Sequence, residues 1–136
     1  MRRTVFLDTS YLLALIRKRD ALHKVALDAS VTYTGPIVTT DLVLVEFANS
    51  LSKPPCRSTA TSVIDKIRSD RNTWVVPFDS EGMDKALALY KERTDKAWGL
   101  VDCFSFVVMK ERRLKVALSF DEHFKQAGFE VPLLER

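Results

Sequence analysis

Short runs of apolar residues alternate along the chain with longer stretches in which apolar residues recur every three or four positions. The short runs are rich in β-branched residues and predict strands at residues 4–7, 37–39, 74–77, 116–119 and 130–133. The longer stretches predict helices at residues 10–17, 21–29, 41–51, 59–69, 81–92, 101–112 and 122–127. Strands that alternate with helices favour an α/β fold in which helices cover a mostly parallel sheet.

Length and composition favour one domain over residues 1–136. Of the 136 residues, 46% are hydrophobic, which is enough to close one core of ordinary size. The charged fraction of 29% is typical of ordered globular chains and argues against a disordered protein. Gly35-Pro36, Lys53-Pro54-Pro55 and residues 94–99 interrupt the periodic pattern, and we interpret them as loops within that domain.

Several features favour a cytoplasmic protein without a membrane span. The N-terminus is basic, but Asp8 interrupts the apolar stretch behind it, which argues against a secretory signal. The longest nearly uncharged run, residues 98–109, is too short to cross a bilayer. Cys56, in a Pro-Pro-Cys-Arg segment that we take as a loop, and Cys103, in an apolar run, are expected to be free thiols in a reducing compartment.

Two aspartates follow predicted strands directly. Asp8 comes after Val5-Phe6-Leu7, and Asp121 follows an apolar run that ends at Phe120. Ligands bind outside the carboxyl ends of parallel strands, so both side chains are expected in one cleft. Asp is also a common helix cap, and two such residues alone do not separate a site from a pair of caps.

Two further acids interrupt apolar helical stretches. Glu46 lies within residues 42–48, and Asp102 is the only charged residue between Trp98 and Met109. Neither has a Lys or Arg three or four positions away. A buried carboxylate without a partner costs several kcal/mol, so each is expected to find a cation, hydrogen bonds or a proton.

Four carboxylates without a set of Cys or His ligands form a hard oxygen site that suits Mg²⁺ or Mn²⁺. Such an ion favours phosphodiester hydrolysis. The net charge of +3 is too small to indicate nucleic acid by itself, so basic residues must surround the cleft. The candidates for that role are Arg17-Lys18-Arg19, Lys24, Lys53 and Arg57, whereas residues 110–115 are expected to be a solvated helix end.

The four acids, in this order and in these contexts, resemble the PIN-domain nucleases, especially the VapC-type toxins of toxin–antitoxin pairs. The resemblance spans nearly the whole chain. It rests on the segments Val5-Phe6-Leu7-Asp8-Thr9-Ser10, Thr39-Thr40-Asp41-Leu42-Val43-Leu44-Val45-Glu46, Leu100-Val101-Asp102-Cys103-Phe104-Ser105-Phe106 and Ser119-Phe120-Asp121-Glu122-His123-Phe124.

The resemblance implies a three-layer α/β/α sandwich and an endoribonuclease in which Asp8, Glu46, Asp102 and Asp121 hold one or two Mg²⁺ or Mn²⁺ ions against an RNA substrate. It further implies a homodimer and a small antitoxin as partners. Supporting hydroxyls are expected from Thr9 or Ser10 and from Ser119, which stands where the family often has Thr.

Some residues near the acids are given structural roles instead. Asp95, in a polar loop, is expected to be solvated; His123 is expected at the surface or as a helix cap. Tyr11 and Trp98 are expected to pack, and Cys103 to be a buried, inert thiol.

Other functions are compatible with parts of the pattern. A haloacid-dehalogenase-type phosphatase needs a second Asp two residues after the first, where this chain has Ser10, and a response-regulator receiver needs paired acids near the first strand. Two alternatives stay open, namely a PIN-like binding or assembly module without activity and a housekeeping RNA-processing nuclease without an antitoxin.

Overall fold

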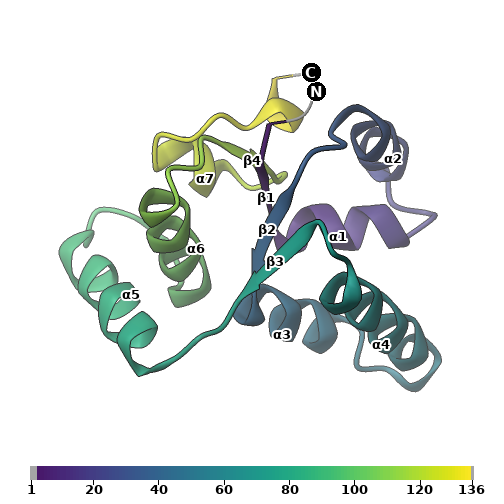
Figure 1. Ribbon diagram of the computed structural model, residues 1–136, viewed down its shortest axis with the longest axis horizontal. Coiled ribbons are helices and arrows are strands. Elements are labelled where there is room, and N and C mark those ends of the chain that lie inside the picture. The colour runs from purple at the N-terminus through teal and green to yellow at the C-terminus, as the bar shows by residue number, and fades with distance from the viewer. Residues whose placement is uncertain (1–2, 136) are drawn as a thin grey trace.

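A computed structural model of the protein describes residues 3–135, so Met1 and Arg2 of the basic N-terminus and the last residue of the predicted domain lie outside the described residues. Its four strands form one parallel sheet in the order β3-β2-β1-β4 (Figure 1). The strands are β1 (Val5–Leu7), β2 (Ile37–Thr40), β3 (Thr73–Val76) and β4 (Val116–Leu118). The predicted parallel α/β class is confirmed.

Helices cover the sheet on both sides. They are α1 (Thr9–Ile16), α2 (His23–Thr32), α3 (Asp41–Ser50), α4 (Pro54–Ser69), α5 (Ser80–Glu92), α6 (Leu100–Glu111) and α7 (Glu122–Gln126). Figure 1 shows α5, α6 and α7 on one side of the sheet and α1, α2 and α4 on the other. No helix within residues 3–135 combines the length and the apolar composition that a bilayer crossing demands.

Proline explains the two largest differences between the observed elements and the predicted ones. Helix α4 begins at Pro54 rather than at residue 59, with Pro in the first turn, where a backbone N–H would have no helical partner anyway. Cys56 therefore lies in a helix and not in a loop. The expected strand at residues 130–133 is wrong, because only a single bridge joins Glu130 to Val116 and a 3-10 turn over Pro132–Leu134 follows.

The core forms around β1, whose three residues are all buried because the strand lies between two neighbours and under helices on both faces. Phe124 from α7 packs against Phe106 of α6 with ring centroids 5.0 Å apart. Trp98 packs edge-on against Phe106 and donates its indole N–H to Gln126. The buried Tyr11 hydroxyl donates to the carbonyl of Ala26. The expected packing roles of Trp98 and Tyr11 are thus confirmed.

The register of β1 and β4 sets the position of the functional residues. Leu7 pairs with Leu118, so the two strands end side by side, and the Asp8 backbone N–H donates to the Leu118 carbonyl at 3.2 Å. The chain passes from β1 to β2 on one side, whereas β4 lies on the other. The strand order therefore switches direction between β1 and β4, where an open parallel sheet forms its ligand crevice.

Candidate active site

Asp8 directly follows β1, beside the end of β4, and is only 5% exposed. It occupies the position before α1, yet its side chain makes no helix-capping hydrogen bond. Its Oδ2 atom instead accepts hydrogen bonds from the hydroxyls of Ser10 and Ser119, each at 2.8 Å. Capping therefore does not account for this buried carboxylate.

The two serine hydroxyls join Asp8 to the segment that follows β4. The Ser119 Oγ atom accepts a hydrogen bond from the Asp121 backbone N–H at 2.9 Å, and the Ser10 Oγ atom accepts one from the Phe120 N–H at 3.0 Å. Each hydroxyl thus donates to the carboxylate and accepts from the loop. The Thr9 hydroxyl, in contrast, is buried without a hydrogen-bond partner among residues 3–135. The positioning role expected of Thr9 or Ser10 is better supported for Ser10.

We expect Ser119→Ala to lower both stability and any activity of the site, because it removes a donor to Asp8 and leaves the Asp121 N–H without its acceptor. A loss of about 1–3 kcal/mol in the free energy of unfolding is expected for such a buried group. Urea denaturation checks this, with Ser52→Ala as control, since Ser52 is exposed. Ser119→Thr, which keeps the hydroxyl, should recover most of the loss. Equal stability of Ser119→Ala and wild type would contradict this role.

The second part of the site consists of Asp102, Asp121 and His123. The His123 Nδ1 atom lies 2.8 Å from Asp102 Oδ2 and 3.4 Å from Asp121 Oδ1. Asp121 also caps α7 by accepting the His123 backbone N–H, and Asp102 accepts the Gly99 N–H at the start of α6. One ligand atom from each of the three side chains lies within 4.8 Å of the others. These three residues thus form a group compact enough to hold a metal ion.

Electrostatics favours a cation in this crevice. Burial raises the pKa of Asp8 to about 6, against the opposing hydrogen bonds from Ser119 and Ser10, and the charge of Asp102 raises it further. Burial likewise raises the pKa of Asp102, while its hydrogen bond to His123 opposes this. Over residues 3–135 no Lys or Arg forms an ion pair with Asp8, Asp102 or Asp121. The carboxylate oxygens fit a hard divalent ion, which would supply the missing positive charge.

Glu46 differs from the other three acids. It lies on α3, and its side chain is exposed, so the expectation that its apolar neighbours bury it is wrong. The physical reason is that only Val43, Leu44 and Phe47 on this helix are buried, whereas the adjacent Val45 is itself 53% exposed. In the described part of the chain, Glu46 is not among the residues grouped within 4.8 Å. Its place in the site rests on the family resemblance.

His123 is the residue that sequence reasoning underestimated. We expected it at the surface or as a helix cap, and the structure instead directs its ring at Asp102 and Asp121. Its place in the sequence could have indicated this role, because it stands two residues after Asp121, at the start of the predicted last helix. Asp95, as expected, is exposed, and the hydrogen bond from Arg93 lowers its pKa to about 2. Cys103 is buried, also as expected.

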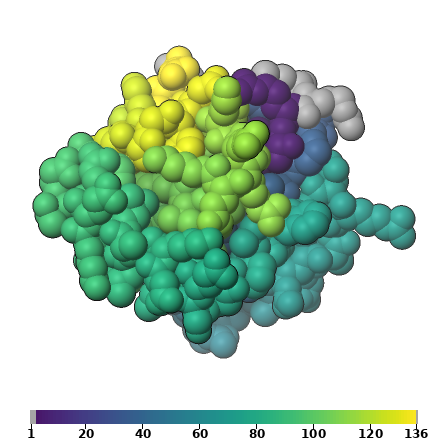
Figure 2. Space-filling model, turned by 60° about the vertical axis from the view of Figure 1, so that its left-hand side comes forward, coloured from purple at the N-terminus to yellow at the C-terminus, as the bar shows by residue number. Residues whose placement is uncertain are grey.

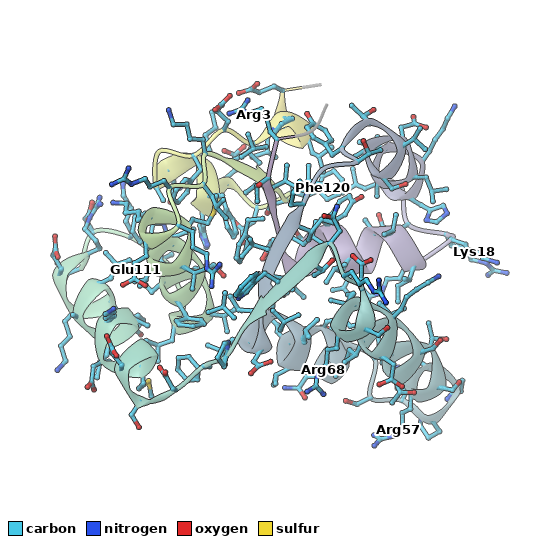
Figure 3. All side chains as sticks on the ribbon, in the orientation of Figure 1. Arg3, Lys18, Arg57, Arg68, Glu111 and Phe120 are labelled. Atoms are coloured by element: carbon cyan, nitrogen blue, oxygen red, sulfur yellow. The ribbon has the colours of Figure 1, made fainter. Side chains whose placement is uncertain are left out.

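Among the described residues, none of the basic side chains expected around the acids forms an ion pair with them. Figure 3 shows Lys18 and Arg57 at the outer ends of α1 and α4, well apart from Phe120, which lies between two site residues. Arg17 and Lys53 line one groove of about 450 Å³ with the end of α3. These basic residues, which we expected around the four acids, are therefore spread over α1, α4 and the end of α3.

The PIN domain family model matches residues 5–130 of the chain. A curated relative, the 23S rRNA-specific endonuclease VapC20 of Mycobacterium tuberculosis, is 27% identical over 125 residues, which make up 92% of this chain and 95% of the relative. The crystal structure of VapC20, described as a Sarcin-Ricin loop cleaving toxin, matches with a TM-score of 0.83 at 27% identity and covers the same shares of the two chains.

Two toxin–antitoxin structures of lower identity share the fold. VapBC2 from Rickettsia felis, bound to a promoter DNA fragment, matches at 16% identity with a TM-score of 0.65 over 94% of this chain and 96% of that chain. VapBC from Salmonella typhimurium, bound to DNA, matches at 15% identity with a TM-score of 0.62 over 96% and 97%. The expected three-layer fold is confirmed. Because the family model matches residues 5–130, nearly the whole chain, the chain belongs to the PIN domain family.

Proposed function

We propose that this protein is a Mg²⁺- or Mn²⁺-dependent endoribonuclease that acts as the toxin of a toxin–antitoxin pair. The observation that carries the proposal is the buried Asp8 carboxylate, joined through Ser119 to Asp121 and influenced by the charge of Asp102. Within residues 3–135 no basic side chain is paired to it. Nucleases need such a site because phosphodiester cleavage develops negative charge on oxygens that a cation must neutralise.

Asp8, Asp102 and Asp121 would hold the ion, with Glu46 as the fourth acid that the resemblance implies. When bound, a divalent ion neutralises phosphate oxygens and lowers the pKa of a bound water. Ser10 and Ser119 fix the Asp8 carboxylate by donating to its Oδ2 atom. His123 orients Asp102 through its Nδ1 atom. The chain's own groups therefore place the carboxylates before any metal or RNA arrives.

The partners of this function are RNA and a small antitoxin, and a homodimer is the expected state. The relatives VapBC2 and VapBC are toxin–antitoxin complexes with the same fold, which supports an antitoxin partner here. Ribosomal RNA is the first substrate to test. The relative VapC20, which this chain matches over 95% of its length, is a 23S rRNA-specific endonuclease.

Cleavage by the purified protein tests the proposal. A total cellular RNA pool and isolated ribosomes would be incubated with Mg²⁺, with Mn²⁺ and with EDTA, and products mapped by primer extension. We expect discrete products that need a divalent ion and disappear in EDTA. Products that persist in EDTA would contradict metal dependence.

A second measurement separates the toxin from a housekeeping nuclease and from a binding module. Induced expression should arrest growth, and coexpression of a short reading frame encoded beside the gene should relieve the arrest. RNA binding without cleavage under every metal condition would favour the binding module. Metal-dependent cleavage without growth arrest would favour the housekeeping nuclease.

A further inference from the structure

Trp74 is a large aromatic side chain that the core does not use. It lies on β3, the edge strand of the sheet, and it is 62% exposed, whereas the other tryptophan, Trp98, is 6% exposed. The structure therefore leaves much of one indole ring outside the core and exposed to solvent.

Three arginines line the two hollows that Trp74 also lines. The Arg112 guanidinium lies 5.1 Å from the Trp74 ring centroid. A groove of about 410 Å³ is lined by Arg71, Asn72, Trp74 and Arg112, along with the residue before β1 and the start of β2. Figure 2 shows this face, where green residues lie beside teal residues below the purple start of the chain. A second hollow of about 450 Å³ is lined by Trp74 and Arg68, and Figure 3 shows Arg68 projecting from α4.

We propose that Trp74 is a stacking site for a nucleobase of single-stranded RNA, with Arg68, Arg71 and Arg112 contacting the neighbouring phosphates. The proposal rests on the proposed function for its choice of RNA. An exposed aromatic ring among cations is the arrangement by which proteins bind single strands, since every base offers a face for stacking and the backbone is anionic.

Charge favours RNA over a second copy of this chain. Among the described residues that line the two hollows, three are arginines and Asp41 is the only acid. A two-fold dimer would bring the same patch of each copy together, so that arginines would face arginines at a cost. A polyanion meets no such repulsion.

The second hollow also links Trp74 to the edge of the sheet where the acids lie. Asp41 directly follows β2, and Pro77 follows β3, so both line the hollow at the carboxyl ends of the strands. From there the hollow extends along β3 to Trp74. An RNA strand that leaves the crevice over this edge would thus reach the ring, and Trp74 would hold a nucleotide outside the cleaved bond.

Tryptophan fluorescence tests the stacking directly. Wild-type protein would be titrated in EDTA with a single-stranded RNA of about 12 nucleotides that lacks self-complementarity. We expect quenching of the exposed indole in wild type and its loss in Trp74→Phe. Anisotropy of labelled RNA should show a roughly 5- to 100-fold weaker affinity for Trp74→Ala. Arg112→Ala should weaken binding and lower the slope of log affinity against log salt by about 1.

Tyr90→Ala provides the matched control, because Tyr90 is also an exposed aromatic residue, with 48% exposure, and lies on α5. The nearby Arg93 forms an ion pair with Asp95, so its charge is already compensated. Its affinity should equal that of wild type, and circular dichroism would verify that each variant is folded. Unquenched wild-type fluorescence together with unchanged affinity in Trp74→Ala would overturn the inference. So would a Trp74→Ala protein that binds RNA normally but sediments as a monomer where wild type is a dimer.

These binding measurements do not depend on catalysis, because EDTA prevents any metal-dependent cleavage. Quenching by RNA in a protein that never cleaves would uphold the stacking site and remove the nuclease proposal. Suppose instead that cleavage depends on Asp8 while Trp74→Ala and Arg112→Ala leave RNA affinity unchanged. That result would uphold the nuclease proposal and remove the stacking site.

Discussion

Asp8→Asn protein is expected to cleave RNA at least about 10³-fold more slowly than wild type while remaining folded, because the substitution removes the charge at the centre of the site. The amide oxygen of Asn still accepts hydrogen bonds from Ser10 and Ser119, so the local structure should persist. Asp102→Asn should have a similar effect. Initial rates on a mapped RNA substrate, at saturating Mg²⁺, measure the loss.

The same assay examines Glu46, whose exposed position makes it the least supported of the four acids. If Glu46 belongs to the site, Glu46→Gln should lose activity by at least about tenfold, whereas Glu92→Gln should not. Glu92 is the matched control because it is also exposed and ends α5. Full activity in Asp8→Asn would remove the proposed site altogether. Full activity in Glu46→Gln alone would reduce it to the three aspartates.

The second large effect concerns stability in the absence of metal. Burial raises the pKa of Asp8 to about 6 in the folded protein, against about 3.9 in an unfolded chain. Between these pH values the folded state binds more protons than the unfolded state, so the free energy of unfolding falls as pH rises from about 4 to about 6 and then levels off. The contribution of Asp8 to this fall is at most about 3 kcal/mol.

Urea denaturation in EDTA at a series of pH values would measure this fall. Asp8→Asn should be less dependent on pH in that window and more stable than wild type at pH 7. Saturating Mg²⁺ should restore stability to wild type at pH 7 and leave Asp8→Asn largely unaffected, since a ligand of the native state stabilises it. Asp95→Asn is the control, because Asp95 is an exposed acid with a lowered pKa. If the free energy of unfolding depended on pH identically in wild type and Asp8→Asn, burial of the Asp8 charge would not be the cause of the fall.

The sequence alone was sufficient for the fold class. Apolar runs such as Val5-Phe6-Leu7 and Val116-Ala117-Leu118 are buried strands of a parallel sheet, which explains why they are short, continuous and rich in apolar residues. It also predicted that Asp8 and Asp121 lie near the carboxyl ends of β1 and β4, because each acid follows an apolar run. The start of α4 was missed because Pro54 was taken as a break, although proline is compatible with the first turn of a helix.

Tertiary structure alone decided which residues act together. Ser119 and Ser10 are 109 positions apart, and only the pairing of β1 with β4 brings both hydroxyls to Asp8. Glu46 is exposed because α3 buries a different face, which a continuous apolar stretch cannot reveal. His123 meets Asp102 through the packing of α6 against α7. Local patterns determine what each segment becomes, whereas side-chain contacts between distant segments depend on packing, and these contacts make the site.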